Sequence, residues 1–134
     1  MSQEQIQKEI EALQEHPMFM TELPKNPEDN VYLSALQSLK YEGKPEEVSQ
    51  ELLQKSKETL AIYITKKNIE SLKESMFNIC NALDHVRDDK ETSYNVKAEL
   101  FLQRGRIQLL VKNWGYAVKD LLDSKSFNEN IPET

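Results

Sequence analysis

The side chains best suited to catalysis or metal binding are few and widely separated in this sequence. The two histidines, His16 and His85, lie far apart in the chain, and neither has the spacing typical of metal ligands. The single cysteine, Cys80, excludes an intrachain disulfide and a multi-cysteine metal site. Its apolar neighbours favour a buried, unreactive thiol. No Ser-His-Asp or Cys-His arrangement finds support, so we expect no catalytic residue, no metal and no cofactor.

Carboxylate pairs and glycines, which could serve acid–base chemistry or phosphate binding, have simpler explanations here. Glu46 and Glu47 follow a proline at an expected helix start, and Asp88 and Asp89 lie in an expected polar loop. None of the three glycines lies in a loop of the kind that cradles phosphate. The sequence therefore predicts a protein that acts by binding and is not an enzyme.

The charge of the chain restricts the class of partner. Its net charge is −6 and its pI is about 5.0, with lysines interleaved among acidic residues. Nucleic-acid binding and attachment to an anionic membrane both need clustered basic residues, so we expect neither. The N-terminus has no signal-peptide pattern, and no stretch is long and apolar enough to cross a bilayer. These features favour a reducing compartment. We expect the cytoplasm, and the nucleus is a further location that fits.

The elements that carry these side chains are predicted to be helices. Apolar residues recur at spacings of three and four, most clearly in Ile69, Leu72, Met76, Ile79, Leu83 and Val86. No segment alternates in the manner of a strand, so the fold class is all-α. Two antiparallel hairpins, residues 48–86 and 94–125, form the expected core within residues 45–134, which end in a polar tail.

Residues 1–44 are expected to form an N-terminal helical extension. A thin apolar stripe predicts a helix over residues 3–15, which His16-Pro17 ends. An apolar plug follows and includes Phe19 and Met20. A second short helix is expected to begin at Asn26-Pro27, because Asn is a good cap and Pro suits the first helical position. Phe19 and Met20 are either partner-binding residues or plain core residues.

Residues 102–120 resemble a tetratricopeptide repeat. The small residues Gly105 and Ala117 fall where the two helices of that repeat cross most closely, and Trp114 falls where an aromatic ring wedges the turn. An unrelated helical hairpin is the alternative. The preceding hairpin matches less well: Ser56 occupies its first small position, but Leu72 stands where alanine is usual.

The segments before the hairpins extend this resemblance to residues 14–125. His16-Pro17-Met18-Phe19-Met20-Thr21, then residues 33–43 and Pro45-Glu46-Glu47, resemble the lead-in of the co-chaperone family that contains tetratricopeptide repeat protein 4 and the cyclophilin seven suppressor protein. The resemblance implies a cytosolic or nuclear, non-catalytic partner of heat-shock protein 90 or heat-shock protein 70. In that family a carboxylate clamp of Lys and Asn holds the chaperone's acidic tail.

The clamp is degenerate in this sequence. Its first lysine corresponds to Leu53, its first asparagine to Lys57 and its second asparagine to Gln103, so Lys57 and Gln103 are the candidate groove residues. The third-repeat cations of the family have no counterpart in these 134 residues. Each lost charge-assisted hydrogen bond removes roughly 1.5–3 kcal/mol, so we expect an isolated chaperone tail to bind weakly or not at all.

The sequence thus predicts a co-chaperone or adaptor, and it leaves one alternative. Val118, Leu121, Leu122 and Phe127 of the last helix cannot all face inward unless the tail folds back. We therefore expect this end to meet a partner or a second copy, or the sequence to be a divergent or shortened relative of the co-chaperone family. The alternative function is a helical structural or assembly subunit that binds through this C-terminal face and never contacts chaperones.

Overall fold

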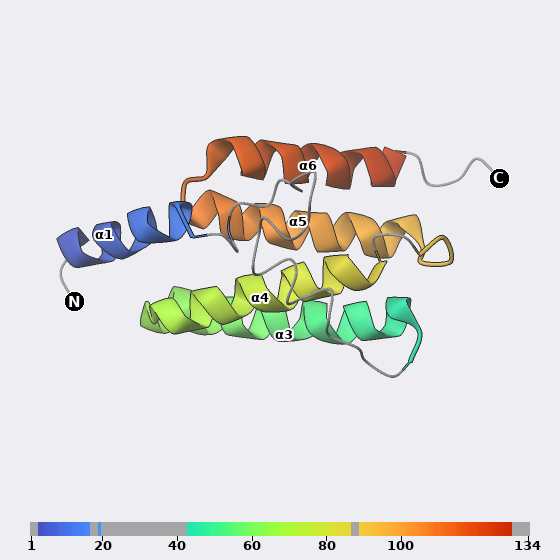
Figure 1. Cartoon of the computed structure of the whole chain (residues 1–134), viewed down its shortest axis with the longest axis horizontal. Coiled ribbons are helices and arrows are strands. Elements are labelled where there is room, and N and C mark those ends of the chain that lie inside the picture. The colour runs from blue at the N-terminus through green and yellow to red at the C-terminus, as the bar shows by residue number, and fades with distance from the viewer. Residues whose placement is uncertain (1–2, 17–18, 20–42, 87–88, 130–134) are drawn as a thin grey trace.

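The computed structural model describes residues 3–16, 19, 43–86 and 89–129. Within these residues the helices are α1 (Gln3–Gln14), α3 (Pro45–Lys66), α4 (Ile69–Val86), α5 (Tyr94–Leu110) and α6 (Trp114–Glu129) (Figure 1). This part of the chain contains no strand, so the all-α prediction is confirmed. The short helix expected from Asn26-Pro27 lies outside the described residues.

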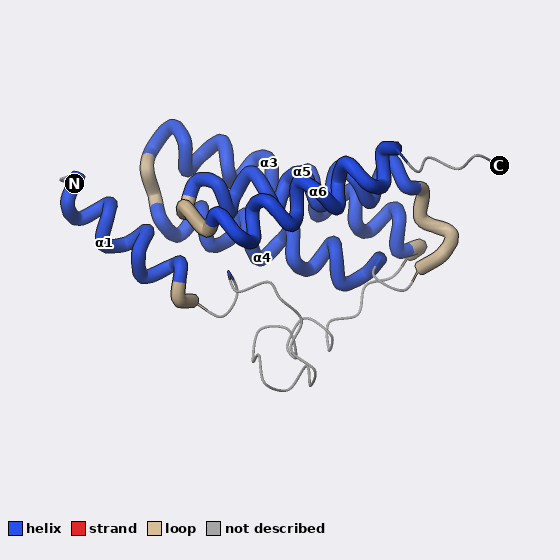
Figure 2. Tube along the Cα trace, turned by 90° about the horizontal axis from the view of Figure 1, so that it is seen from above, coloured by secondary structure: helices blue, strands red, loops and turns tan. Residues whose placement is uncertain are grey.

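The helices α3 to α6 form two antiparallel hairpins that stack on each other. The pair α3–α4 lies beneath the pair α5–α6 in Figure 1, and α5 packs against both helices of the first hairpin. Viewed from above, α1 projects from one end of the stack (Figure 2). That end is where α5 passes into α6, because Gln14 Nε2 of α1 donates to Val111 O at 2.7 Å.

The turn between α3 and α4 shows how local chemistry sets the helix ends. Pro45 begins α3 at a position where a missing N–H costs nothing. Lys67, with φ 56°, ends the helix in the left-handed conformation, and its N–H donates to Tyr63 O at 2.7 Å. The next residue, Asn68, starts α4, because its side chain accepts from the N–H of Glu70 at 3.0 Å.

The second hairpin begins and ends by similar means. The Ser93 hydroxyl accepts from Val96 N at 3.3 Å and caps α5. After α5, Lys112 adopts a positive φ of 62°, and the Asn113 side chain donates to Gln108 Oε1 at 2.9 Å. Helix α6 then begins at Trp114, so Gly115 lies inside it.

The core follows the periodicity of the sequence. Apolar side chains from both hairpins and from α1 form one buried cluster: Ile10, Leu13, Leu52, Leu53, Leu60, Tyr63, Leu72, Met76, Ile79, Leu83, Leu100 and Ile107. Cys80 is also buried, as the sequence predicted. His85 lies within α4.

The close crossing of the second hairpin is confirmed at Gly105, but its neighbours differ from the prediction. A Cβ on Gly105 would lie 3.0 Å from Leu121 Cδ2 and 3.4 Å from Asp120 Cβ, so these residues, and not Ala117, are its closest neighbours across α6. Trp114 does not wedge the turn, because 59% of it is exposed. The hydrogen bonds of Asn113 to Gln108 hold the turn instead.

Candidate functional site

Gln103, the first candidate groove residue, lies inside the stack. Only 1% of it is exposed, and its Nε2 donates to Ser56 Oγ at 3.2 Å. A buried amide must satisfy its donors within the protein, and Ser56 of α3 supplies an acceptor. The expectation that Gln103 faces an open groove is therefore wrong. Its side chain joins α5 to α3.

Ser56 belongs to a buried polar cluster that the sequence did not reveal. Its Oγ lies 2.9 Å from Ser75 O, and Ser75 Oγ donates to Ser56 O at 2.7 Å. Small hydroxyl side chains let α3 and α4 approach closely at this point, as Gly105 does for α5 and α6. With Gln103 the cluster connects three helices. Its signal in the sequence was the small residue at position 56, but the partners lie 19 and 47 residues away.

Lys57, the second candidate, is exposed at the side where α3 and α5 meet. Its Nζ lies 4.0 Å from Glu99 Oε2 of α5. An incoming carboxylate at Lys57 therefore also approaches the negative charge of Glu99, which opposes its binding. Leu53, which replaces the first lysine of the clamp, is 6% exposed and apolar. The structure thus brings Lys57 and Gln103 to neighbouring positions, but it does not assemble a set of donors around a shared ligand.

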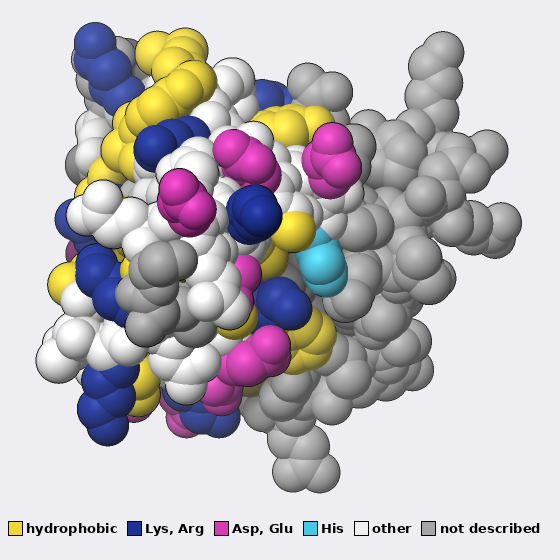
Figure 3. Space-filling view, turned by 90° about the vertical axis from the view of Figure 1, so that its left-hand side faces the viewer, with side chains coloured by type: hydrophobic (Ala, Val, Ile, Leu, Met, Phe, Trp, Pro, Cys, Tyr) yellow, Lys and Arg dark blue, Asp and Glu magenta, His cyan; other side chains and the backbone are white. Residues whose placement is uncertain are grey.

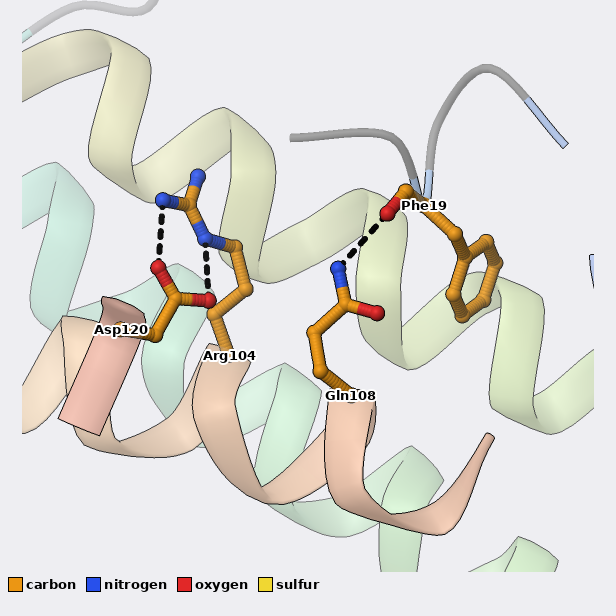
Figure 4. A network of polar contacts seen from close by, with 4 residues as sticks. All are labelled: Phe19, Arg104, Gln108 and Asp120. Atoms are coloured by element: carbon orange, nitrogen blue, oxygen red, sulfur yellow. Dashed lines mark hydrogen bonds and ion pairs between the residues drawn. The ribbon is translucent and has the colours of Figure 1, made fainter. Parts of the chain in front are cut away.

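Phe19 is a core residue in this structure. It is fully buried, and its carbonyl oxygen accepts from Gln108 Nε2 at 2.8 Å (Figure 4). Gln108 in turn accepts from Asn113, so one amide links the plug to the turn before α6. Of the two readings of this residue, the structure places Phe19 in the core. Met20 lies outside the described residues.

A buried ion pair joins α5 to α6 (Figure 4). Arg104 Nε and Nη2 donate to Asp120 Oδ2 and Oδ1 at 3.0 and 2.8 Å, and the Asp120 side chain is 1% exposed. Cys80 of α4 contacts this pair, and burial raises the pKa of its thiol to about 11, although Arg104 opposes the shift. The thiol is therefore protonated at neutral pH and unreactive. The sequence reasoning missed this pair.

The described residues show neither a metal-binding cluster nor a membrane-spanning helix. None of their His, Cys, Asp and Glu side chains form a group of three that could hold a metal ion. Over the same residues, no helix combines the length and the hydropathy that crossing a membrane requires. The remaining candidate is a set of exposed apolar side chains.

Three of the most exposed apolar residues form a stripe along α6. Trp114, Val118 and Leu122 are 59%, 53% and 59% exposed, and they follow one another at spacings of four. Figure 3 views the molecule from the end where α6 begins and shows hydrophobic side chains along the upper left edge, at the height of α6. The sequence expectation that part of α6 cannot face inward agrees with these exposures. Phe127 packs on Phe101 with the ring centroids 5.6 Å apart.

Residues of α5 extend this stripe across the hairpin. Gly105 meets Leu121, and Leu102 and Leu109 lie three residues before and four residues after Gly105. Helices α5 and α6 run antiparallel. For this reason, side chains at the same sequence offset from the contact, such as Leu102 before Gly105 and Val118 before Leu121, lie on the same side of the hairpin. We call this side the open face, and it consists of Leu102, Leu109, Trp114, Val118, Leu121 and Leu122.

The first hairpin has an equivalent face, and there it is covered. Counted from the contact of Ser56 with Ser75, the positions that match Leu102, Leu109, Val118 and Leu122 are Leu53, Leu60, Leu72 and Met76. These four residues are at most 7% exposed. Helix α5 packs on this side, with Leu100 and Ile107 in the same buried cluster. The open face of the second hairpin is therefore equivalent to the face of the first hairpin that α5 covers.

Comparisons with known proteins add no relative. No family model matches the chain, and neither a curated protein nor a solved structure shows significant similarity to it.

Proposed function

We propose that this chain is a non-enzymatic protein-interaction module, an adaptor of heat-shock protein 90 or heat-shock protein 70, that binds its partner through the open face. The observation that carries the proposal is the contrast between two equivalent surfaces. Leu72 and Met76 are fully buried in the first hairpin, whereas the matching Val118 and Leu122 are more than half exposed in the second. The choice of these chaperones as the partner rests on the resemblance of the sequence to the co-chaperone family.

Covering the open face would contribute favourable free energy to a contact. Full burial of a leucine or valine contributes about 1.5–3 kcal/mol, so covering the exposed halves of Val118 and Leu122 supplies roughly 0.8–1.5 kcal/mol each. Trp114 exposes a larger ring, of the type that anchors protein interfaces. An aspartate at either aliphatic position would lose this term and place a charge in the contact.

A titration against purified chaperones tests the proposal. Wild-type chain is titrated with intact heat-shock protein 90, intact heat-shock protein 70 and forms of both that lack the acidic tail. Because the clamp donors are not assembled, we expect tail deletion to leave the affinity unchanged. Binding that disappears with the tail, or no binding to either chaperone, would overturn the proposal.

Paired variants locate the contact on the chain. Val118→Asp combined with Leu122→Asp is expected to weaken chaperone binding at least tenfold, which corresponds to roughly 1.4 kcal/mol. The matched control is Ile62→Asp combined with Ile64→Asp, because these α3 residues are also exposed, at 42% and 53%, but lie outside the open face. Equal losses in the two double variants would count against the open face.

Assembly with a second copy is the competing function, and the same exposed side chains favour it. The net charge of −6 opposes close approach of two copies. Sedimentation of the wild-type chain separates the two functions: a monomer is expected here, and a dimer that the Val118→Asp, Leu122→Asp variant abolishes would establish self-assembly.

A further inference from the structure

We infer that the buried hydrogen bond between Gln103 and Ser56 selects the register of the stack, which is the axial position of α5 along α3. Its main role is this selection and not the stability of the fold. The observation behind the inference is a polar pair enclosed by apolar residues in the contact between the two hairpins. The inference is independent of the proposed function, because it concerns a contact inside the stack.

Two polar contacts show how α5 lies along α3. Gln103 follows its partner Ser56 by 47 residues, and Ser93, directly before α5, follows its partner Glu46 by the same 47. The two helices run in the same direction (Figure 1), so a constant offset means that neither is shifted against the other. The contact of Ser93 with Glu46 is exposed, so water can replace it. The contact of Gln103 with Ser56 is buried.

Apolar residues on both sides of the polar pair share this offset. Three residues before the pair and four residues after it, each helix carries a buried apolar residue, and these are Leu53 and Leu60 of α3 and Leu100 and Ile107 of α5. At the offset of 47, each apolar residue of α5 lies level with one of α3. After a slip by one turn, the apolar residues of α5 would face the next apolar residue or the small Ser56. Apolar packing therefore discriminates poorly between registers.

The amide of Gln103 does discriminate between them. After a slip by one turn it would lie level with Leu53 or Leu60, and neither side chain offers an acceptor. Only 1% of Gln103 is exposed, so water cannot take the place of Ser56. A buried amide without a partner keeps the full cost of its desolvation. The Ser56 hydroxyl also lies 2.9 Å from Ser75 O, so the penalty for a wrong register falls on Gln103.

The other buried polar side chains of α5 hold it less firmly to the first hairpin. Gln108 donates to the carbonyl oxygen of Phe19, which lies outside that hairpin. Arg104 contacts the Cys80 thiol of α4, but a thiol is a weak hydrogen-bond acceptor. The contact of Gln103 is thus the one that makes a slip of α5 costly. Single buried amides set the register of coiled coils in the same way.

Nitroxide labels on one exposed residue of each helix measure the register. Glu58→Cys on α3 and Asn95→Cys on α5 supply the labelling sites, and Cys80→Ala in every chain prevents a third label. From the offset of the two helices, these sites lie about 15 Å apart along the helix axes. A slip by one turn changes this separation by about 5.4 Å. Pulsed electron paramagnetic resonance then measures the distance between the labels in each folded chain.

The decisive comparison is between Gln103→Leu and Leu100→Met. Leu100→Met changes a neighbouring buried residue of α5 and keeps the amide, so we expect one distance, as in the chain without either substitution. Gln103→Leu makes the buried stripe of α5 wholly apolar. It should populate a second distance roughly tenfold more, which corresponds to about 1.4 kcal/mol. Its urea midpoint should not fall, because an apolar side chain of similar size replaces the amide.

Three results would contradict the inference. A single distance in Gln103→Leu would show that apolar packing fixes the register without the amide. A second distance of equal population in Leu100→Met would assign the slip to any change of packing. A Gln103→Leu chain that does not fold, or whose urea midpoint falls below that of Leu100→Met, would show that the amide stabilises the stack and does not select its register.

Discussion

The crossing of α5 and α6 at Gly105 can be tested by adding one methyl group. In Gly105→Ala the new Cβ would lie 3.0 Å from Leu121 Cδ2, 3.2 Å from Leu121 Cγ and 3.4 Å from Asp120 Cβ. Ordinary contacts between carbon atoms are longer, about 3.5–4.0 Å. Leu121 is partly exposed and can move, but Asp120 is held by two hydrogen bonds to Arg104. The methyl group therefore meets one mobile and one fixed neighbour.

Two opposing free energies determine the result. Alanine favours a helix interior over glycine by about 1 kcal/mol, whereas overpacking costs roughly 1–3 kcal/mol. We expect Gly105→Ala to lower the free energy of unfolding by about 1 kcal/mol, the middle of that balance. In the Leu121→Ala background both leucine carbons are gone, so the same substitution should raise the free energy of unfolding by up to about 1 kcal/mol.

The assay is urea unfolding followed by circular dichroism on the four chains of this double-mutant cycle. The expected coupling free energy between positions 105 and 121 is about 2 kcal/mol, well above the 0.3–0.5 kcal/mol scatter of independent sites. Additive effects within that scatter would refute the close crossing. An increase in the free energy of unfolding for Gly105→Ala in the wild-type background would show that the Leu121 side chain can move away from the new methyl group without destabilising the fold.

Three further predictions concern buried or partly buried polar groups. Arg104→Met leaves the Asp120 carboxylate buried without its cation and should destabilise the fold by about 3–5 kcal/mol, measured by urea unfolding. Burial and, secondarily, Lys73 lower the pKa of His16 below its usual 6.5. The imidazole of His16 is therefore protonated less readily in the folded state than in the unfolded state. Stability should therefore fall as pH drops through about 6.5, and His16→Gln should flatten that dependence between about pH 8 and pH 5. The Cys80 thiol, with its pKa raised to about 11 by burial, should react with a disulfide reagent only after denaturation.

Local sequence signals predicted the helices well, because spacing and breakers act within a few residues. The stripe from Ile69 to Val86 corresponds to the full length of α4, and Pro45 marks the first residue of α3. Both hairpins were expected within a few residues of their observed bounds. The hydrophobic periodicity fixes which side of each helix is buried, and that decides the fold class.

The candidate site was harder to predict, because its residues depend on partners that are distant in the sequence. Gln103 looked like a groove donor, but its amide is satisfied by Ser56, 47 residues earlier. Trp114 looked like a wedge, but Asn113 and Gln108 hold the turn with polar contacts and leave the ring outside. Neither outcome follows from spacing, because spacing does not say which polar group finds a partner inside.

The hydrogen bond from Gln14 to Val111 has a consequence for how the chain folds. In an open stack of repeats each unit touches only its neighbours, so folding can start at one unit and spread, and an end can fray alone. Here a residue before the first hairpin is tied to one 97 residues later, in the turn of the second. Melting the second hairpin would also release the N-terminal helix. The two ends should therefore lose structure together, as a single cooperative unit, despite the repeat-like arrangement between them.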